Sequence, residues 1–181
     1  MARSLPRRLV PVAALLAACL LPLAASAAPR HGQASSVAIS TLESGVLADI
    51  NSMRHAHGLA PLRLSVPLTA AARQHTTSMA LKGYFSHDSA DGSSFATRLR
   101  HYYSLSHYRT WTVGENMLWS SPDVDPARAL ELWMNSPPHR ENLLSRAWRE
   151  IGISAVHVPS APGVYGGDEV TIITTDFGAR S

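Results

Sequence analysis

The order of secondary-structure signals along the chain is the feature that most constrains its fold. Four segments have the apolar spacing of helices: 42–57, 66–82, 95–102 and 127–135. Two segments rich in β-branched residues, 150–156 and 170–177, then close the sequence, and the loop between them is rich in Pro and Gly. Helices followed by a terminal antiparallel hairpin predict an α+β fold in which helices cover a small sheet.

Residues that start and stop helices support these boundaries. Gly58 and Gly83 directly follow the first two helical patterns, where glycine commonly ends a helix. Asp125 and Pro126 precede the fourth pattern; Asp can accept hydrogen bonds from unpaired amides, and Pro fits the first turn. The sequence therefore predicts where three of the helices begin or end.

The second half of the chain contains less regular stretches. We expect 111–113 and 117–119 to be extended and Gly114-Glu115-Asn116 to interrupt them. The Pro pair at 137–138 must end the preceding helix, and Ser136 is placed to cap a short helical turn that follows.

The chain begins with the pattern of a secretion signal. Residues 1–8 are basic, 9–23 are mostly apolar, and Ala25-Ser26-Ala27 is a cleavage site of small residues. The sequence thus predicts a signal peptide over 1–27, a flexible tether over 28–40 and one domain over 41–181, with no transmembrane segment in the mature chain. A secreted or periplasmic location follows.

A second processing route remains open. The segment Leu16-Ala17-Ala18-Cys19 resembles the lipobox of bacterial lipoproteins, in which the cysteine carries the lipid anchor. Apolar residues follow Cys19 where a lipoprotein normally turns polar. Release after Ala27 is therefore favoured over anchoring through Cys19.

Charge and cysteine content exclude some functions. The chain has 16 Lys and Arg against 13 Asp and Glu, but three of the arginines lie in residues 1–27. The mature domain is therefore near electroneutral, and the electrostatic basis for nucleic-acid binding is missing. Because Cys19 is the only cysteine, the domain has no disulfide and no thiol nucleophile. The sequence carries no signal for an oligomeric state.

Three residues far apart in the sequence are candidates for one site: His87, Glu115 and His139. Imidazole and carboxylate are the usual ligands of zinc-like ions and the usual groups that move protons near neutral pH. No cofactor is required by the sequence, but this set could hold a divalent metal such as zinc. The alternative is a buried polar network that locks three segments together.

A hydrolytic function would need a nucleophile. Ser86 and His87 are adjacent on an extended segment and should point in opposite directions. Ser136 is better explained as a helix cap. A metal-bound water activated by Glu115 is therefore the catalytic hypothesis to retain.

Several ordered segments carry a resemblance to a known family. They include Asn51-x-x-Arg54, Leu68-x-x-Ala71-Ala72-x-x-His75, Phe85-Ser86-His87, Gly114-Glu115-Asn116, Trp133-Met134-Asn135-Ser136-Pro137-x-His139-Arg140, Gly152-Ile153 and Asp176-Phe177-Gly178. Together they resemble the CAP superfamily, or SCP-domain proteins: cysteine-rich secretory proteins, antigen 5 (allergen V5-like) and pathogenesis-related proteins. The likeness is greatest to the bacterial branch that has few cysteines, and it extends from about residue 42 to residue 177.

The resemblance implies a three-layer α-β-α sandwich with a central antiparallel sheet. It also implies a large cleft with two His and two acidic residues, a set that binds a divalent metal in some members. His87, Glu115 and His139 fall on three of the four places, and Ser136 falls on the fourth. Glu131 should face elsewhere, because the five helical positions that separate it from Ser136 turn the helix by roughly 140°.

Activities attributed to the family are diverse: sterol and fatty-acid binding, proteolysis, and protein–protein inhibition or signalling. The fold alone does not select among them. We expect an extracellular domain whose cleft binds a lipid, a peptide or an envelope polymer. The alternatives are a metal-dependent, peptidase-like hydrolase and a host- or envelope-interaction scaffold, so whether the protein is an enzyme stays open.

Overall fold

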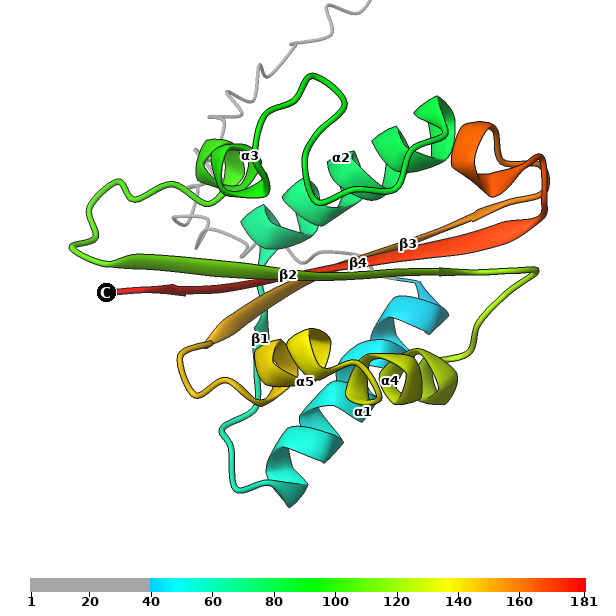
Figure 1. Cartoon of the computed structure of the whole chain (residues 1–181). Helices are drawn as coiled ribbons and strands as arrows, with labels where there is room; N and C mark the ends of the chain where they lie inside the picture. Colours follow the sequence, from blue (N-terminus) through cyan, green and yellow to red (C-terminus); the bar gives the residue numbers. More distant parts are fainter. Residues whose placement is uncertain (1–39) are drawn as a thin grey trace, which may run out of the picture. The chain divides into compact units, whose positions relative to one another are not determined.

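The computed structural model of the chain describes residues 40–181, which form a four-stranded sheet between two layers of helices (Figure 1). The strands are β1 (Arg63–Leu64), β2 (Trp111–Ser120), β3 (Glu150–Val158) and β4 (Val170–Arg180). Their order in the sheet is β1-β3-β4-β2. β4 pairs antiparallel with both β2 and β3, and the short β1 adds a parallel pairing to β3. The predicted signal peptide, Cys19 and all of the predicted tether except Ser40 lie outside the described residues.

Helices cover both faces of the sheet, which gives the α-β-α sandwich that the resemblance implied. In Figure 1, α2 (Val66–Lys82) and α3 (Phe95–Tyr102) lie above the sheet, and α1 (Thr41–Ala56), α4 (Pro126–Met134) and α5 (Pro137–Leu144) lie below it. A short 3-10 helix, η1 (Gly163–Tyr165), lies in the loop that joins β3 to β4. Within residues 40–181, the helices are all too short or too polar to cross a lipid bilayer.

Caps define the helix ends, and the predicted end of α2 at Gly83 and start of α4 at Asp125 are confirmed. Ser40 and Glu43 form a reciprocal capping box at the start of α1, and the other oxygen of Glu43 accepts a hydrogen bond from the backbone of Ala155 at 2.8 Å. Gly83 ends α2 in the left-handed conformation, with φ of +68°. The side chain of Asp125 accepts from the backbone amide of Arg128 at the start of α4. Local chemistry therefore defines these boundaries.

Alternation along β2 and β4 divides their side chains between the two helical layers. On the upper face, Thr174 accepts a hydrogen bond from Thr76 of α2 at 2.8 Å. On the lower face, Leu118 and Phe177 pack in one buried cluster with Trp133 of α4. Glu115 shares the upper face with Thr174, so its side chain is directed towards α2 and α3.

Gly152 allows α2 to pack closely on the sheet. A Cβ atom at this position would lie 2.1 Å from the backbone carbon of Leu68 and 2.2 Å from the backbone nitrogen of Thr69. No side chain fits in that space. Glycine here sets the distance between α2 and β3, and thereby the position of the loop that follows α2.

The expected interruption of β2 is wrong. The strand is continuous from Trp111 to Ser120, because each residue in this segment pairs in unbroken register with β4. Glycine at position 114 does not break the strand; it makes room for Trp148, whose ring carbon Cζ2 would lie 2.8 Å from an added Cβ. The sequence signal of Gly114 therefore reflects close packing and not a turn.

The expected helix-capping hydrogen bond of Ser136 is also absent. Ser136 occupies the position before α5, but its side chain makes no capping hydrogen bond. The helix starts there because Pro137 fits its first turn. The Ser136 side chain instead lines a surface hollow that is described below.

β2 lies at the edge of the sheet, and side chains from the lower layer cover part of that edge. The amide of Asn142 donates to the backbone oxygen of Glu115 at 3.1 Å, and the indole of Trp133 donates to that of Met117 at 3.2 Å. These bonds satisfy carbonyl groups that β4 does not reach. The candidate site is built around this covered edge.

Candidate functional site

His87 and Glu115 form the centre of the candidate site. His87 lies in the loop after α2, and its Nδ1 is 2.8 Å from Oε1 of Glu115 on β2. The Glu115 side chain is 1% exposed, whereas that of His87 is 51% exposed. A buried carboxylate thus holds the inner nitrogen of the ring as a donor and leaves Nε2 on the solvent side.

Arg98 completes this arrangement, and the sequence analysis did not identify it as a site residue. Its side chain is 3% exposed and forms an ion pair with Oε2 of Glu115. Its Nη1 also donates to the backbone oxygen of His87 at 3.0 Å. One guanidinium therefore fixes both the carboxylate and the backbone of the histidine.

One sequence signal could have revealed Arg98. In α3, the residues Phe95, Leu99 and Tyr102 are spaced to form one apolar stripe, and Arg98 falls within it. A charge on the inner side of a helix needs a buried partner. The pattern predicts that such a partner exists, although it does not identify Glu115.

The contacts among His87, Glu115 and Arg98 determine which of these side chains carry a charge. The hydrogen bond to Glu115 raises the pKa of His87 above its ordinary value. Burial alone would raise the pKa of Glu115, but the hydrogen bond from His87 and the charge of Arg98 outweigh it and hold this pKa below its ordinary value. Glu115 is thus an anion that stabilises protonated His87.

His75 supports the loop that carries His87. The ring is fully buried, and its Nε2 lies 2.9 Å from the backbone oxygen of Ser86. His75 is therefore a hydrogen-bonded core residue and not part of an open site. Tyr165 donates to the backbone oxygen of Tyr84 at 2.9 Å, so the segment before His87 is held at two points.

His139 and Ser136 lie on the lower side of the β2 edge, away from the contact between His87 and Glu115. They line a hollow of about 290 Å³, here called the edge cleft, whose lining residues are Phe85, Met117, Leu118, Trp119, Leu132, Trp133, Ser136 and His139. Burial lowers the pKa of His139, and the neighbouring charge of His87 lowers it further. The two histidines are therefore close enough to interact electrostatically.

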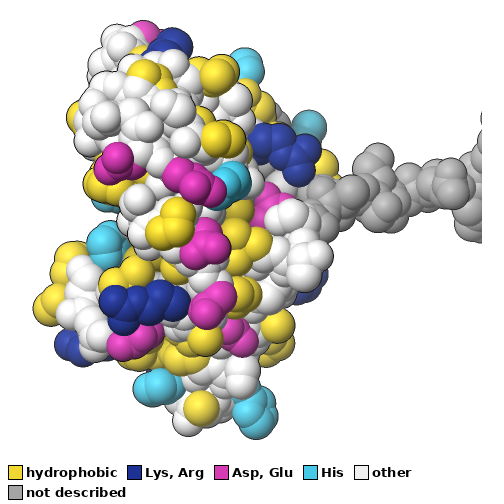
Figure 2. Space-filling model, turned by 90° about the vertical axis from the view of Figure 1, so that its right-hand side faces the viewer, with side chains coloured by type: hydrophobic (Ala, Val, Ile, Leu, Met, Phe, Trp, Pro, Cys, Tyr) yellow, Lys and Arg dark blue, Asp and Glu magenta, His cyan; other side chains and the backbone are white. Residues whose placement is uncertain are grey.

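Apolar side chains of the edge cleft are partly exposed at the surface. In Figure 2, the outline narrows between the upper and lower layers, and hydrophobic side chains (yellow) reach the surface among acidic ones (magenta). Phe85 and Trp119 are 36% and 38% exposed. Two partly exposed aromatic side chains that line one hollow give a ligand apolar surface to cover.

The fourth position of the expected set of two His and two acidic residues holds no carboxylate. Ser136 occupies it, and Glu131 is exposed on α4, where it pairs with Arg128 at 2.8 Å. This confirms that Glu131 faces elsewhere. The structure therefore brings His87 and Glu115 into contact, places His139 and Ser136 in the adjacent edge cleft, and adds Arg98.

The donors do not form a complete metal site in their present arrangement. Both oxygens of Glu115 are held by His87 and Arg98. Over residues 40–181, no group of three or more His, Cys, Asp and Glu side chains is placed to hold a metal ion. His87 and His139 offer two imidazoles at most, whereas catalytic zinc sites commonly use three protein ligands. The zinc hypothesis stays a prediction.

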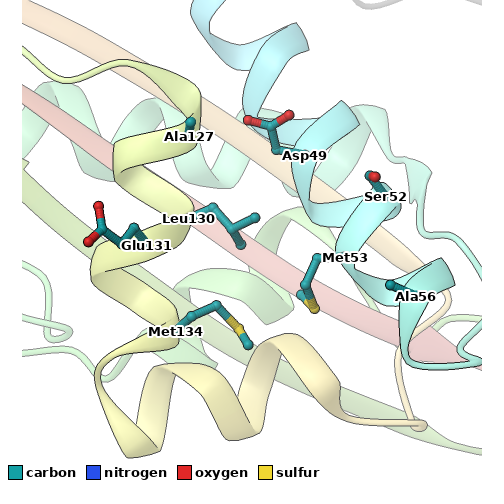
Figure 3. A pocket seen from close by; sticks show the side chains of 8 residues that line it. All are labelled: Asp49, Ser52, Met53, Ala56, Ala127, Leu130, Glu131 and Met134. Atoms are coloured by element: carbon teal, nitrogen blue, oxygen red, sulfur yellow. The ribbon is translucent and has the colours of Figure 1, made fainter.

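A second hollow, the α1/α4 groove, lies on the lower layer. Its volume is about 460 Å³, and Figure 3 shows Met53, Leu130 and Met134 directed into the space between the two helices. Asp49 and Glu131 flank the same groove. The groove is a second apolar surface, and it contains no residue of the predicted site.

Comparison with known proteins identifies the family. The three-layer sandwich is shared with solved SCP domains of bacteria. A model of the cysteine-rich secretory protein family, CAP, matches residues 47–171. The chain therefore belongs to the CAP family, as its sequence motifs predicted.

Individual relatives agree with this assignment. YkwD, an uncharacterized protein of Bacillus subtilis (strain 168), is 32% identical over 119 residues, which are 65% of this chain and 44% of YkwD. The chain thus spans less than half the length of this relative. An extracellular protein with an SCP domain from Bacillus anthracis is 26% identical, with a TM-score of 0.55 over 78% of this chain and 44% of that one.

A more distant structure shows the fold alone. An outer surface protein of Borrelia burgdorferi has a TM-score of 0.59, and the match covers 75% of this chain and 90% of that one, at 18% identity. The sandwich is therefore retained where most residues have changed.

Proposed function

We propose that this chain is an extracellular ligand-binding module that takes up an apolar group of a lipid or a peptide in its edge cleft. The predicted signal peptide supports an extracellular location, as do the similar extracellular protein of Bacillus anthracis and outer surface protein of Borrelia burgdorferi. Binding, rather than catalysis, is the function that the geometry supports best.

The observation that carries the proposal is the composition of the edge cleft. Six of its eight lining residues are apolar or aromatic, and His139 and Ser136 supply polar groups beside them. Its volume of about 290 Å³ is near the lower end of the range for small-molecule sites, roughly 300–1,000 Å³. Such a space suits one apolar side chain or the end of an acyl chain.

His87 adds a polar contact next to this apolar space. Its ring is oriented by Glu115 and Arg98, so Nε2 is presented in a fixed direction. A peptide carbonyl or a lipid head group could accept a hydrogen bond there. The ligand that fits is amphipathic, with its apolar part in the edge cleft.

Identification of co-purified molecules in the wild type and in substituted variants tests the proposal. The secreted protein is purified without detergent, and bound small molecules are identified by native mass spectrometry. We expect a co-purified lipid or peptide in the wild type and its loss in Phe85→Ala. Leu105→Ala is the matched control, because Leu105 is a similarly exposed apolar residue, 37% against 36%, outside the edge cleft.

The α1/α4 groove provides the competing location. Met134→Ala shortens a side chain that lines this groove and is absent from the lining of the edge cleft. Loss of ligand in Met134→Ala with retention in Phe85→Ala would move the site to the groove and overturn the proposal. If a protein that co-purifies with the wild type is retained by both Phe85→Ala and Met134→Ala, the chain acts instead as an interaction scaffold that uses its outer face.

A metal-dependent hydrolase remains the second candidate, on one observation. A carboxylate behind a histidine, as Glu115 lies behind His87, is the arrangement that orients metal-binding histidines in other proteins. After dialysis against zinc, one ion per chain that is lost in both His87→Ala and His139→Ala would favour this candidate. Zinc well below one ion per chain, together with chelator-insensitive ligand binding, favours the binding module.

A further inference from the structure

A polar hollow lies between α2, α3 and the loop that joins them, and apart from Arg98 its lining residues take no part in the function proposed above. Its volume is about 340 Å³. α2 contributes Gln74, the loop before α3 contributes Ser89, Asp91 and Ser93, and α3 contributes Thr97 and Tyr102. We call it the polar hollow, to distinguish it from the edge cleft.

The loop wall of the polar hollow is held by its own hydrogen bonds. Backbone bonds link Ser89 and Ser93 at 2.8 Å and Gly92 and Ser89 at 2.8 Å. Asp91 accepts from both the backbone and the hydroxyl of Ser93, at 2.9 and 2.7 Å. The lining groups are therefore presented in a defined arrangement before any ligand arrives, which lowers the entropic cost of binding.

Arg98, whose side chain is 3% exposed, also lines the polar hollow. Its guanidinium is already engaged by Glu115, by the backbone of His87 and by the hydroxyl of Ser89 at 3.2 Å. Beside it, hydrogen bonds from Ser93 hold the pKa of Asp91 below its ordinary value, so this carboxylate is charged at neutral pH. A paired cation next to a charged carboxylate disfavours an anionic ligand.

The remaining lining groups share one property. The hydroxyls of Ser89, Ser93 and Thr97, the amide of Gln74 and the imidazole of His101 can each donate and accept hydrogen bonds. The half-buried ring of Tyr102 packs edge-on against His101 at 5.1 Å and supplies an apolar surface. Groups that both donate and accept, beside one aromatic ring, match a ligand that carries neighbouring hydroxyl groups on an apolar ring.

We propose that the polar hollow binds a neutral carbohydrate, seating one sugar ring of a glycan between Gln74, Thr97 and Tyr102. The carboxylate of Asp91 accepts from a sugar hydroxyl, and the serine and threonine hydroxyls satisfy the others. This site is separate from the edge cleft, so a glycan and an apolar ligand can be bound by one chain.

Titration of the isotope-labelled protein with three neutral trisaccharides tests the proposal: those of N-acetylglucosamine, of β-linked glucose and of α-linked glucose. We expect at least one of them to shift backbone amide signals of 89–93 and 97–102, with a dissociation constant of about 1 mM or lower. Lack of any shift at concentrations well above this value, or shifts confined to other segments, would overturn the proposal.

Substitutions that leave the core untouched locate the binding. Gln74→Leu and Thr97→Val each remove hydrogen-bonding groups from an exposed helix position while keeping the side chain similar in size. We expect each to weaken binding about tenfold, equivalent to one or two lost hydrogen bonds. Thr77→Val is the matched control on α2, outside the polar hollow, and should bind as the wild type does.

Two outcomes separate this site from the proposed function. Equal binding by Gln74→Leu, Thr97→Val and the control would place the sugar elsewhere and refute the inference. Phe85→Ala should keep its carbohydrate binding even where it loses a co-purified ligand. The failure of one proposal would therefore leave the other standing.

Discussion

Glu115 on β2 lies directly opposite Asp176 on β4, and both side chains are buried against the upper layer of helices. Opposed residues of an antiparallel pair point to the same face, so these two carboxyl groups are neighbours. Two charged carboxylates cannot share such a space. Arg98 and His87 stabilise the charge of Glu115, and the proton therefore stays on Asp176.

The first prediction concerns that proton. Burial raises the pKa of Asp176 well above its ordinary value, and the charge of Glu115 raises it further. A raised carboxyl pKa costs the folded state stability as pH rises above the ordinary pKa. Asp176→Asn removes this cost, so its melting temperature relative to wild type should increase between about pH 5 and about pH 7.5.

The exposed Asp168→Asn is the matched control for this measurement and should show no such trend. A large loss of stability in Asp176→Asn at neutral pH would mean that the folded protein needs a charged carboxylate at this position.

The second prediction concerns Arg98. Arg98→Ala leaves Glu115 buried and without its guanidinium partner. Removal of one partner of a buried ion pair lowers the free energy of unfolding by about 3–5 kcal/mol. Arg100→Ala is the control: Arg100 is exposed on the same helix and lies 5.0 Å from the ring centre of Trp111, a contact of about 0.5–1 kcal/mol. Urea unfolding measures both. Similar losses in the two variants would show that Arg98 is solvated.

A second substitution separates the charge from the packing. Glu115→Gln in the Arg98→Ala background removes the unpaired carboxylate and should restore part of the lost stability. If the double variant is no more stable than Arg98→Ala alone, the guanidinium acts mainly by filling space.

The third prediction is the titration of His87. Because the hydrogen bond to Glu115 raises the pKa of His87, Glu115→Gln should lower it, as followed by NMR of the ring protons. The protonated ring stabilises the folded protein below its ordinary pKa, and this contribution fades as pH rises through the raised value. Glu131→Gln, an exposed change on α4, should leave the titration as it is in wild type.

The fourth prediction concerns the packing of α2. Gly152→Ala would force an atom into the backbone of Leu68 and Thr69, and we expect a loss of about 3 kcal/mol or more in the free energy of unfolding. Gly58→Ala is the comparison, because Gly58 has φ of +66° but open space around it and should cost only about 1–2 kcal/mol. A small effect at Gly152 would show that α2 can move away from the sheet.

Local signals predicted much of this fold. The two helices that begin at Val66 and Phe95 have the predicted bounds, because a glycine or a serine beside each one provides a local stop or start. The predicted break in β2 was wrong because a long-range interaction, and not a local signal, determines the structure of this segment. Gly114 has a turn-like signal, but pairing with β4 overrides it, and such pairing joins residues about 60 positions apart in sequence.

The sequence by itself determined four of the helical segments, the terminal hairpin and the family, and it singled out His87, Glu115 and His139 as candidate site residues, because helix caps, apolar spacing and short motifs all lie within neighbouring residues. The tertiary structure alone decided that Glu115 contacts His87 and Arg98, that His139 lines the neighbouring edge cleft, and that Asp176 lies opposite Glu115. These contacts depend on how α3 and α5 pack on the two sides of one edge strand. Long-range packing of this kind follows from the whole core and has no local pattern in the chain.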